Sequence, residues 1–375
     1  MKKIQMVDLQ TQYTKIKEEI DAGIAEVINS ASFIKGPKVA EFQAHLEQYT
    51  GAKHVINVGN GTDALQIALM GLGLQPGDEV ITPTFTFIAT AEVVALLGLT
   101  PVVVDVDWET MNMDIESVRR AITPHTKAIV PVHLFGQCAN MEAIMELANE
   151  HHLYVIEDAC QAIGAQYTFS NGETKQAGTI GHIGCTSFFP SKNLGCYGDG
   201  GAIFTNDDEL ADKMQAIANH GCHIRYHHDE VGVNSRLDSI QAAVLDAKLP
   251  HLNEYIAARQ KAAAYYDNAF ADNEKLLIPG REPHSTHVFH QYTLRVVGAD
   301  RDALREGLAA RGIPAMIYYP VPLHQQKAYL DPRYKDGDFP AAERLAACVL
   351  SLPMHTELDE EQLQFITSSV LDLIR

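Results

Sequence analysis

The chain has 375 residues, 46% of them hydrophobic, which is enough to build one large or two medium-sized domains around a real core. It carries 48 acidic and 29 basic residues, and its formal net charge of −19 disfavours nucleic acid and anionic membranes as partners. The first residues lack the apolar core of a signal peptide, and the long apolar run at 91–106 is interrupted by Gly98, Thr100 and Pro101. Six dispersed cysteines without CxxC spacing are expected to be reduced thiols, so we expect a cytoplasmic protein.

Short runs rich in valine and isoleucine recur along the first half of the chain. They occupy residues 54–58, 78–83, 100–106, 127–132 and 153–159, and the segments between them have helical spacing. Nearly continuous apolar strands are buried on both faces, so the pattern predicts an α/β fold with a mostly parallel central sheet flanked by helices. Ligands of such sheets bind beyond the carboxyl ends of the strands.

The pattern changes after about Lys248, which predicts a large domain (residues 1–248) and a smaller C-terminal α+β domain (residues 249–375). Helical spacing occurs around residues 259–270 and 300–312, with a β-prone run at 290–297 and a proline-marked loop at 318–324. Residues 357–374 predict an amphipathic final helix. Its apolar stripe comprises Leu358, Leu363, Ile366 and Val370.

A turn that can hold a phosphate follows the first predicted strand. The sequence GNGTDALQIAL starts at Gly59 and opens a helix, so Gly61 and Thr62 offer backbone N–H groups and a hydroxyl at its positive end. The alternative is an ordinary strand-to-helix turn that Thr62 or Asp63 merely caps. The turn lacks the lysine of a Walker loop, which argues against an NTPase.

An acidic residue stands at the carboxyl end of the fifth predicted strand. Asp158 points to the opposite face from Glu157, and a carboxylate buried there requires a cationic partner. Gln161 follows three residues later and can stack or hydrogen-bond beside the same partner. The alternative is a helix cap or a surface acid.

A single lysine lies in a glycine-rich segment between two β-prone runs, residues 186–190 and 202–205. Lys192 follows Ser187 and two phenylalanines, and a dry pocket there would make its amine nucleophilic. An exposed loop lysine is the alternative for any one lysine considered alone. Together, the turn, the strand-end acid and the lysine favour a site for a phosphorylated aldehyde that contains a pyridine ring.

Seven segments, in order and at compatible spacings, resemble the DegT/DnrJ/EryC1/StrS family of sugar-nucleotide aminotransferases. They read NGTDAL, GDEVITPTFTFIATAEVVALLG, PVHLFGQ, EDACQAIGA, TSFFPSKNLGCYGDGGAI, VGVNSRLDSIQAAVL and YYPVPLH. The resemblance runs from about residue 6 to the C terminus. It implies fold type I of the enzymes that depend on pyridoxal 5'-phosphate (PLP).

The resemblance assigns roles to matching residues. Lys192 would link covalently to PLP and Asp158 would pair with the pyridine nitrogen, which makes both catalytic. The cofactor-binding set is Gly61, Thr62, Phe87, Asp158, Gln161, Ser187, Lys192 and Asn234. In this family the asparagine comes from the neighbouring subunit, which implies a homodimer with active sites at its interface.

Two positions, Arg236 and Tyr319, match those at which the family contacts substrate, and Tyr318 occupies a neighbouring position that varies in the family. The implied reaction moves an amino group from L-glutamate to a nucleotide-linked keto sugar through pyridoxamine 5'-phosphate. The lysine segment is most similar to enzymes that act at C3 of a UDP-2-acetamido-3-keto-hexuronate for surface polysaccharide.

Other functions remain open on the sequence alone. One is a C4 aminotransferase for a UDP- or dTDP-4-keto-6-deoxy sugar. Others are a PLP lyase or decarboxylase and a non-catalytic PLP-binding regulator, although the chain has no helix-turn-helix extension. Some relatives replace the lysine with histidine and dehydrate sugars, whereas this chain keeps Lys192, which favours transamination.

A histidine-rich segment, residues 219–228, suggests two interpretations. The irregular spacing of His220, His223, His227, His228 and Cys222 argues against zinc, so we expect no metal site. We expect instead a loop near the substrate entrance, where Arg225 and His227 meet a diphosphate.

Overall fold

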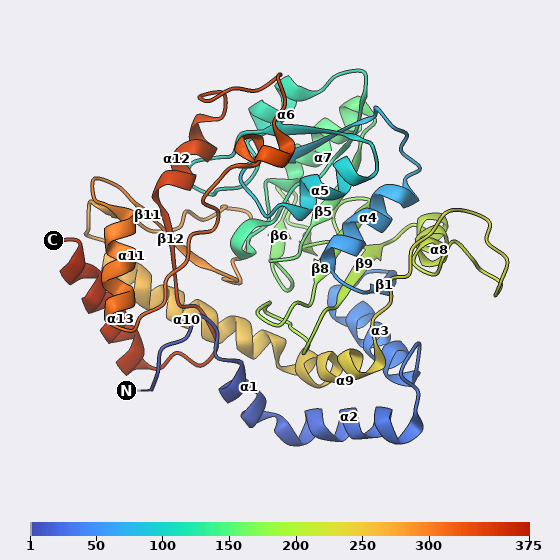
Figure 1. The fold of residues 1–375 in the computed structure, drawn as a ribbon, viewed down its shortest axis with the longest axis horizontal. Helices are drawn as coiled ribbons and strands as arrows, with labels where there is room; N and C mark the ends of the chain where they lie inside the picture. The colour runs from blue at the N-terminus through green and yellow to red at the C-terminus, as the bar shows by residue number, and fades with distance from the viewer. Residues whose placement is uncertain (1) are drawn as a thin grey trace.

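The computed structural model describes residues 2–375, and its centre is a seven-stranded sheet with strand order β1-β9-β8-β5-β4-β2-β3 (Figure 1). The strands are β1 (His54–Val58), β2 (Glu79–Pro83), β3 (Thr100–Val104), β4 (Thr126–Ile129), β5 (Tyr154–Asp158), β8 (Ile183–Ser187) and β9 (Gly201–Thr205). The neighbouring pairs from β8 to β3 are parallel, whereas β9 runs antiparallel to both β1 and β8. The five predicted strands and the mostly parallel α/β sheet are confirmed.

Helices cover both faces of this sheet, because successive strand residues point to opposite sides. On β5, Val155 belongs to one hydrophobic core and Ile156 to the other. The first core contains side chains of α3 (Pro37–Thr50), α6 (Ile115–Ala121), α7 (Met141–His151) and α9 (Ser239–Lys248). The second contains side chains of α4 (Gly61–Gly71), α5 (Ala89–Leu96) and α8 (Asp208–Ile217). Two further helices, α1 (Leu9–Lys15) and α2 (Lys17–Ser30), precede them.

The C-terminal part has its own antiparallel sheet of β10 (Leu276–Leu277), β11 (Tyr292–Val296) and β12 (Val349–Leu352). Its helices are α10 (Leu252–Phe270), α11 (Arg301–Ala310), α12 (Pro340–Cys348) and α13 (Glu360–Leu373). The predicted stripe of α13 is confirmed, since Leu363, Ile366 and Val370 are buried in a third core. Ile4 joins that core, so the start of the chain lies beside the C-terminal helices (Figure 1). The domain boundary at residues 248 and 249 stays a prediction.

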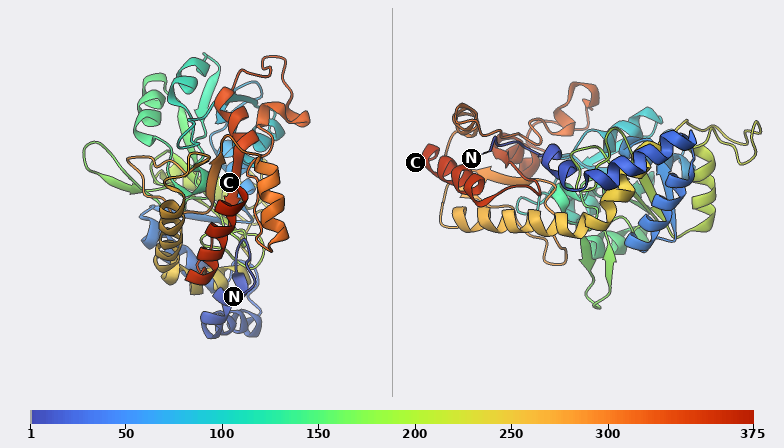
Figure 2. Two further views of the ribbon diagram at one scale, coloured as in Figure 1. Left: turned by 90° about the vertical axis from the view of Figure 1, so that its left-hand side faces the viewer. Right: turned by 90° about the horizontal axis from the view of Figure 1, so that it is seen from below.

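Helix α10 spans two cores. Leu252 and Ile256 near its start belong to the first core, whereas Tyr266 and Phe270 at its end belong to the third. Figure 2 shows this helix, in yellow to orange, as a straight rod in its right-hand view. Arg259 is buried at the middle of the rod and donates hydrogen bonds of 3.0 Å to the carbonyls of Phe289 and Met354.

Smaller elements complete the described chain. They are the hairpin of β6 (Gln166–Thr168) and β7 (Thr174–Gln176) and the short 3-10 helices η1 (Leu134–Gly136), η2 (Leu249–His251), η3 (Leu323–Gln325) and η4 (Lys327–Tyr329). Within residues 2–375, no helix combines the length and the apolar character needed to span a bilayer.

Candidate active site

A cavity of about 660 Å³ opens at the carboxyl ends of β5 and β8, beside the first turn of α4. Such a volume suits a small-molecule cofactor together with part of a substrate. Its lining comprises Asn60, Gly61, Thr62, Asp63, Leu65, Thr86, Phe87, Ala89, Asp158, Cys160, Gln161, Ser187, Phe189, Ser191, Lys192, Asp199, His290, Gln291, Tyr318 and Tyr319. The structure therefore brings together nine of the residues predicted for the site.

Asp158 forms one wall of the cavity and is 6% exposed. The hydroxyl of Thr90 donates to its Oδ2 at 2.8 Å, and the backbone N–H of Cys160 donates to its Oδ1 at 3.2 Å. Two neutral donors orient this carboxylate and leave its negative charge available to a cationic group in the cavity. The alternative interpretation of Asp158 as a surface acid is wrong.

Lys192 faces the same space from the glycine-rich segment. Burial lowers the pKa of its amine below the usual value, although the nearby Cys160 and Asp158 act in the opposite direction. Among the residues that the structure describes, no hydrogen bond or ion pair holds this amine. A larger fraction of it is therefore unprotonated near neutral pH, and an unprotonated amine can attack an aldehyde. The alternative of an exposed loop lysine is wrong.

The segment around Lys192 needs glycine because it folds tightly on itself. A Cβ atom on Gly195 would lie 2.4 Å from the carbonyl oxygen of Pro190. The backbone N–H of Cys196 donates to the carbonyl of Phe188 at 2.8 Å, and the side-chain amide of Asn193 donates to Val288 at 2.9 Å. These contacts fix the position from which the lysine side chain reaches the cavity.

The first turn of α4 provides a cradle for an anion. The side chain of Asn60 caps the helix by accepting from the N–H of Asp63 at 2.8 Å, so the idea that Thr62 or Asp63 provides the cap is wrong. A Cβ atom on Gly61 would lie 2.7 Å from the Cβ of Ser187, so only glycine lets this backbone approach β8. Thr62 keeps a free hydroxyl within the described structure, next to the positive end of the helix.

Aromatic and amide groups close another side of the cavity. The side-chain oxygen of Gln161 accepts from the N–H of Phe135 at 2.9 Å, and its nitrogen donates to the hydroxyl of Tyr319 at 3.2 Å. Phe87 is 53% exposed, and its ring centre lies 6.2 Å from that of Tyr319. Burial raises the pKa of the Tyr319 hydroxyl. The tyrosine therefore stays protonated and can donate a hydrogen bond.

Four predicted residues lie outside the cavity of their own chain. Asn234 is exposed, and Arg236 lines a separate cavity of about 320 Å³. Arg225 and His227 are exposed on the segment after α8, which extends away from the rest of the molecule (Figure 1). Contact of these residues with a cofactor or substrate stays a prediction. Within residues 2–375, no three side chains of His, Cys, Asp or Glu converge on a possible metal site.

Sequence reasoning missed several residues that the fold brings to the site. Thr90 lies 68 residues before Asp158 and has no local signal for its role. Asn60 could have been found, because asparagine before a helix is a common cap. His290 is buried in the cavity wall, where burial and the charges of Lys192 and Arg259 hold its pKa well below the usual value.

The group that fits this cavity has an aldehyde for Lys192, a basic ring nitrogen for Asp158 and a phosphate for the start of α4. Pyridoxal 5'-phosphate has all three. Fold and site together are those of a PLP-dependent transferase of fold type I.

The chain matches the DegT/DnrJ/EryC1/StrS aminotransferase family over residues 14–371, and it belongs to that family. It is 48% identical to the UDP-2-acetamido-2-deoxy-3-oxo-D-glucuronate aminotransferase of Pseudomonas aeruginosa, covering 98% of this chain and 99% of the relative. It is 47% identical to the UDP-N-acetyl-3-dehydro-alpha-D-glucosamine 3-aminotransferase of Acidithiobacillus ferrooxidans, with 98% and 97% covered. A relative named pleiotropic regulatory protein, from Geobacillus stearothermophilus, is 48% identical, with 99% of each chain covered.

Solved structures agree with this assignment. A DegT DnrJ EryC1 StrS aminotransferase from Brucella abortus superimposes with a TM-score of 0.94 at 42% identity, covering 99% of each chain. NtdA from Bacillus subtilis, solved with bound cofactor PMP, gives a TM-score of 0.88 at 31% identity, covering 98% of this chain and 83% of that one. The protein is therefore a PLP-dependent sugar aminotransferase.

Proposed function

We propose that the protein transfers an amino group from L-glutamate to C3 of a UDP-linked 2-acetamido-3-keto-hexuronate, in the cytoplasm, for the synthesis of a surface polysaccharide. The observation that carries this proposal is the pair of relatives at 48% and 47% identity, since both are named for UDP-linked 3-oxo sugars with an acetylated nitrogen. A C4 enzyme is less supported, because the names of these two relatives place the keto group at C3.

The chemistry divides between the cofactor and the chain. PLP supplies an electron sink that stabilises the negative charge left on carbon when a proton is removed. Asp158 keeps the ring nitrogen protonated, because a carboxylate favours the charged form of a base beside it. The amine of Lys192 takes the proton from one carbon and returns it to another as a general acid and base. Gln161 and Phe87 would flank the ring, while Gly61, Thr62 and Ser187 would hold the phosphate.

A panel of nucleotide-linked keto sugars tests which sugar the enzyme uses. Each reaction contains the protein, L-glutamate and one keto sugar. The sugars are the UDP-2-acetamido-3-keto-glucuronate, the matching 3-keto-glucosamine, and UDP- and dTDP-4-keto-6-deoxy sugars. We expect kcat/KM to be about tenfold or more higher for the uronate than for the sugar without its carboxylate, since an ion pair to a charged group is lost. Preference for a 4-keto sugar would contradict the proposal. Absence of any turnover would favour the regulatory alternative that the name of one relative suggests.

A second subunit supplies the cations in this proposal. Among residues 2–375, the cavity lining has one amine, Lys192, against the carboxylates of Asp63, Asp158 and Asp199. A nucleoside diphosphate sugar with a carboxylate is strongly anionic and needs more positive charge than this lining offers. Arg225 and Arg236 lie outside the cavity of their own chain and would supply that charge to the partner in a homodimer.

Mixed dimers test this arrangement. Lys192→Ala and Arg236→Ala are expected to be inactive or weakly active alone. When the two variants are unfolded, mixed in equal amounts and refolded, half of the dimers combine one chain of each kind. One of the two sites in such a dimer has both side chains, so about a quarter of the wild-type activity should return. If Arg236 served its own chain, mixing would restore nothing.

A further inference from the structure

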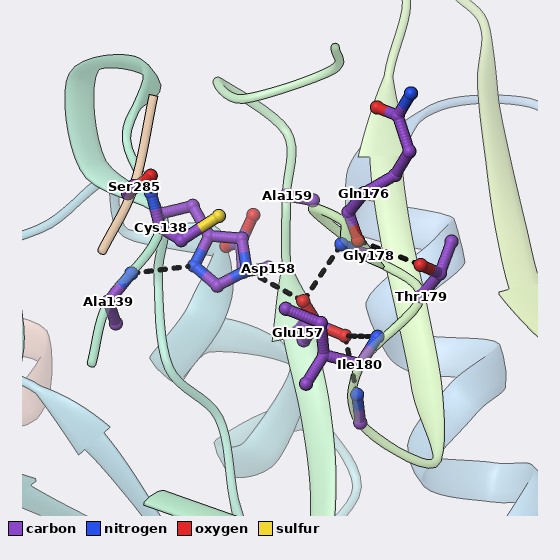
Figure 3. A network of polar contacts seen from close by, with 12 residues as sticks. Cys138, Ala139, Glu157, Asp158, Ala159, Gln176, Gly178, Thr179, Ile180 and Ser285 are labelled. Atoms are coloured by element: carbon purple, nitrogen blue, oxygen red, sulfur yellow. Dashed lines mark hydrogen bonds and ion pairs between the residues drawn. The ribbon is translucent and has the colours of Figure 1, made fainter. Parts of the chain in front are cut away.

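A second carboxylate, that of Glu157, lies on the other face of the sheet from the carboxylate of Asp158. Glu157 precedes Asp158 on β5, points to the opposite face of the sheet and is completely buried. Its Oε1 accepts hydrogen bonds from the backbone N–H groups of Ile180 and Gly181, both at 2.6 Å, and its Oε2 accepts from Gly178 at 2.8 Å (Figure 3). A buried carboxylate with this many donors is held as an anion in a single orientation.

The fourth donor is His133, which is also completely buried. Its Nε2 lies 2.8 Å from Oε2 of Glu157, and its Nδ1 lies 3.1 Å from the backbone nitrogen of Ala139. A backbone N–H can only donate, so Nδ1 accepts and the ring proton sits on Nε2. The geometry therefore sets both the tautomer and the orientation of the ring.

Backbone contacts connect this pair to the active site. The N–H of His133 donates to the carbonyl of Asp158 at 3.0 Å, next to the parallel bridge between Val132 and Asp158. Two residues further on, the N–H of Phe135 holds the side-chain oxygen of Gln161. His133 thus lies between the strand that carries the acid and the turn that orients the amide.

The hydrogen bonds that Glu157 accepts also connect β5 to β8. The three backbone donors come from the turn at residues 178–181, which leads into the strand that ends at Ser187. This turn is packed tightly, since a Cβ atom on Gly184 would lie 1.9 Å from the carbonyl oxygen of Gly178. Glu157 therefore fixes β8 beside β5 from the rear of the sheet.

We propose that Glu157 and His133 are positioning residues, which hold Asp158 and Gln161 in the orientation that the cofactor requires. Neither side chain lines the cavity, so neither touches the reacting atoms. The proposal rests on the PLP site described above and is independent of which sugar the enzyme uses.

The test compares Glu157→Gln with Val155→Ala. Both residues are completely buried and point to the same face of β5, so Val155→Ala shows what loss of packing alone does at this face. In Glu157→Gln an amide N–H faces backbone donors, and we expect the turn and Asp158 to shift. A displaced Asp158 protonates the ring nitrogen less well. With less positive charge in the ring, the nitrogen that joins Lys192 to the cofactor would keep its proton to higher pH, so the visible absorption of the cofactor-loaded protein should titrate at higher pH. We also expect about tenfold weaker binding of PLP to the apoprotein and a kcat about tenfold lower, with KM within about twofold.

Val155→Ala should lower the melting temperature but leave the absorption titration and PLP binding unchanged. If Glu157→Gln behaves in the same way, the pair supports only the fold and the proposal is overturned. A second comparison remains useful if Glu157→Gln does not fold. His133→Gln keeps one donor and one acceptor and should retain the wild-type titration, whereas His133→Phe should shift it.

Nitrogen NMR of the wild-type apoprotein provides a further check without any substitution. With ¹⁵N-labelled histidine, the shifts of His133 near neutral pH should be those of the neutral Nε2–H tautomer. A protonated ring, or a proton on Nδ1, would contradict the network as described.

Discussion

Replacing Lys192 with alanine is expected to lower kcat by about 10³-fold or more, because the same amine both anchors the cofactor and moves the proton. In the wild-type protein, borohydride should fix PLP to one lysine, which proteolysis and mass spectrometry then identify. We expect the label on Lys192 only and no label in the alanine variant.

Lys248 provides an internal control for this experiment. Burial lowers its pKa to about 8, so it too has an amine that loses its proton easily. Its Nζ, however, donates to the carbonyl of Gly195 at 2.7 Å, and it does not line the cavity. A label on Lys248 instead of Lys192 would mean that amine basicity, and not the geometry of the site, selects the residue.

Replacing Asp158 with asparagine is expected to lower kcat by about 10²-fold or more while KM for the sugar changes little. The amide keeps the shape but loses the charge that favours a protonated ring nitrogen, so the cofactor withdraws electrons less well. Steady-state kinetics on a fixed substrate measure the effect. An unchanged kcat would show that the charge at this position has no role in the reaction.

A milder substitution separates the effect of the charge of Asp158 from the effect of its orientation. Thr90→Val removes the 2.8 Å hydrogen bond to Asp158 but keeps the carboxylate. A hydrogen bond to a charged group contributes about 1.5 kcal/mol or more, so we expect a fall in kcat of roughly tenfold. A loss as large as that of Asp158→Asn would mean that orientation accounts for the whole effect.

Much of the fold could be predicted because its signals are local. The residues of the runs at 54–58 and 153–159 are shared between two apolar cores, as expected of strands buried on both faces. The reversed direction of β9 could not be predicted, because residues 201–205 read like any buried strand. Its pairing with β1 and β8 depends on the path of the glycine-rich segment, which no local pattern records.

The residues of the site also divide into those with a local sequence signal and those without one. Lys192, Asp158 and Gln161 stand in segments with a distinctive composition, and the structure places all three around one cavity. Thr90 and His133 act through partners 68 and 24 residues away, so their roles exist only after the sheet has formed. Residues that would cross to a second subunit, such as Asn234, lie outside the cavity of their own chain, and the backbone bridge from Asn234 to Asn219 indicates no role in the site.

Helix α10 limits how this enzyme can move. Because one continuous rod inserts Leu252 into the first core and Phe270 into the third, the two cores cannot rotate against each other without bending a helix whose middle is pinned by Arg259. Opening and closing around a bulky nucleotide sugar must therefore fall to surface segments. We therefore expect the two cores to move together as one rigid body.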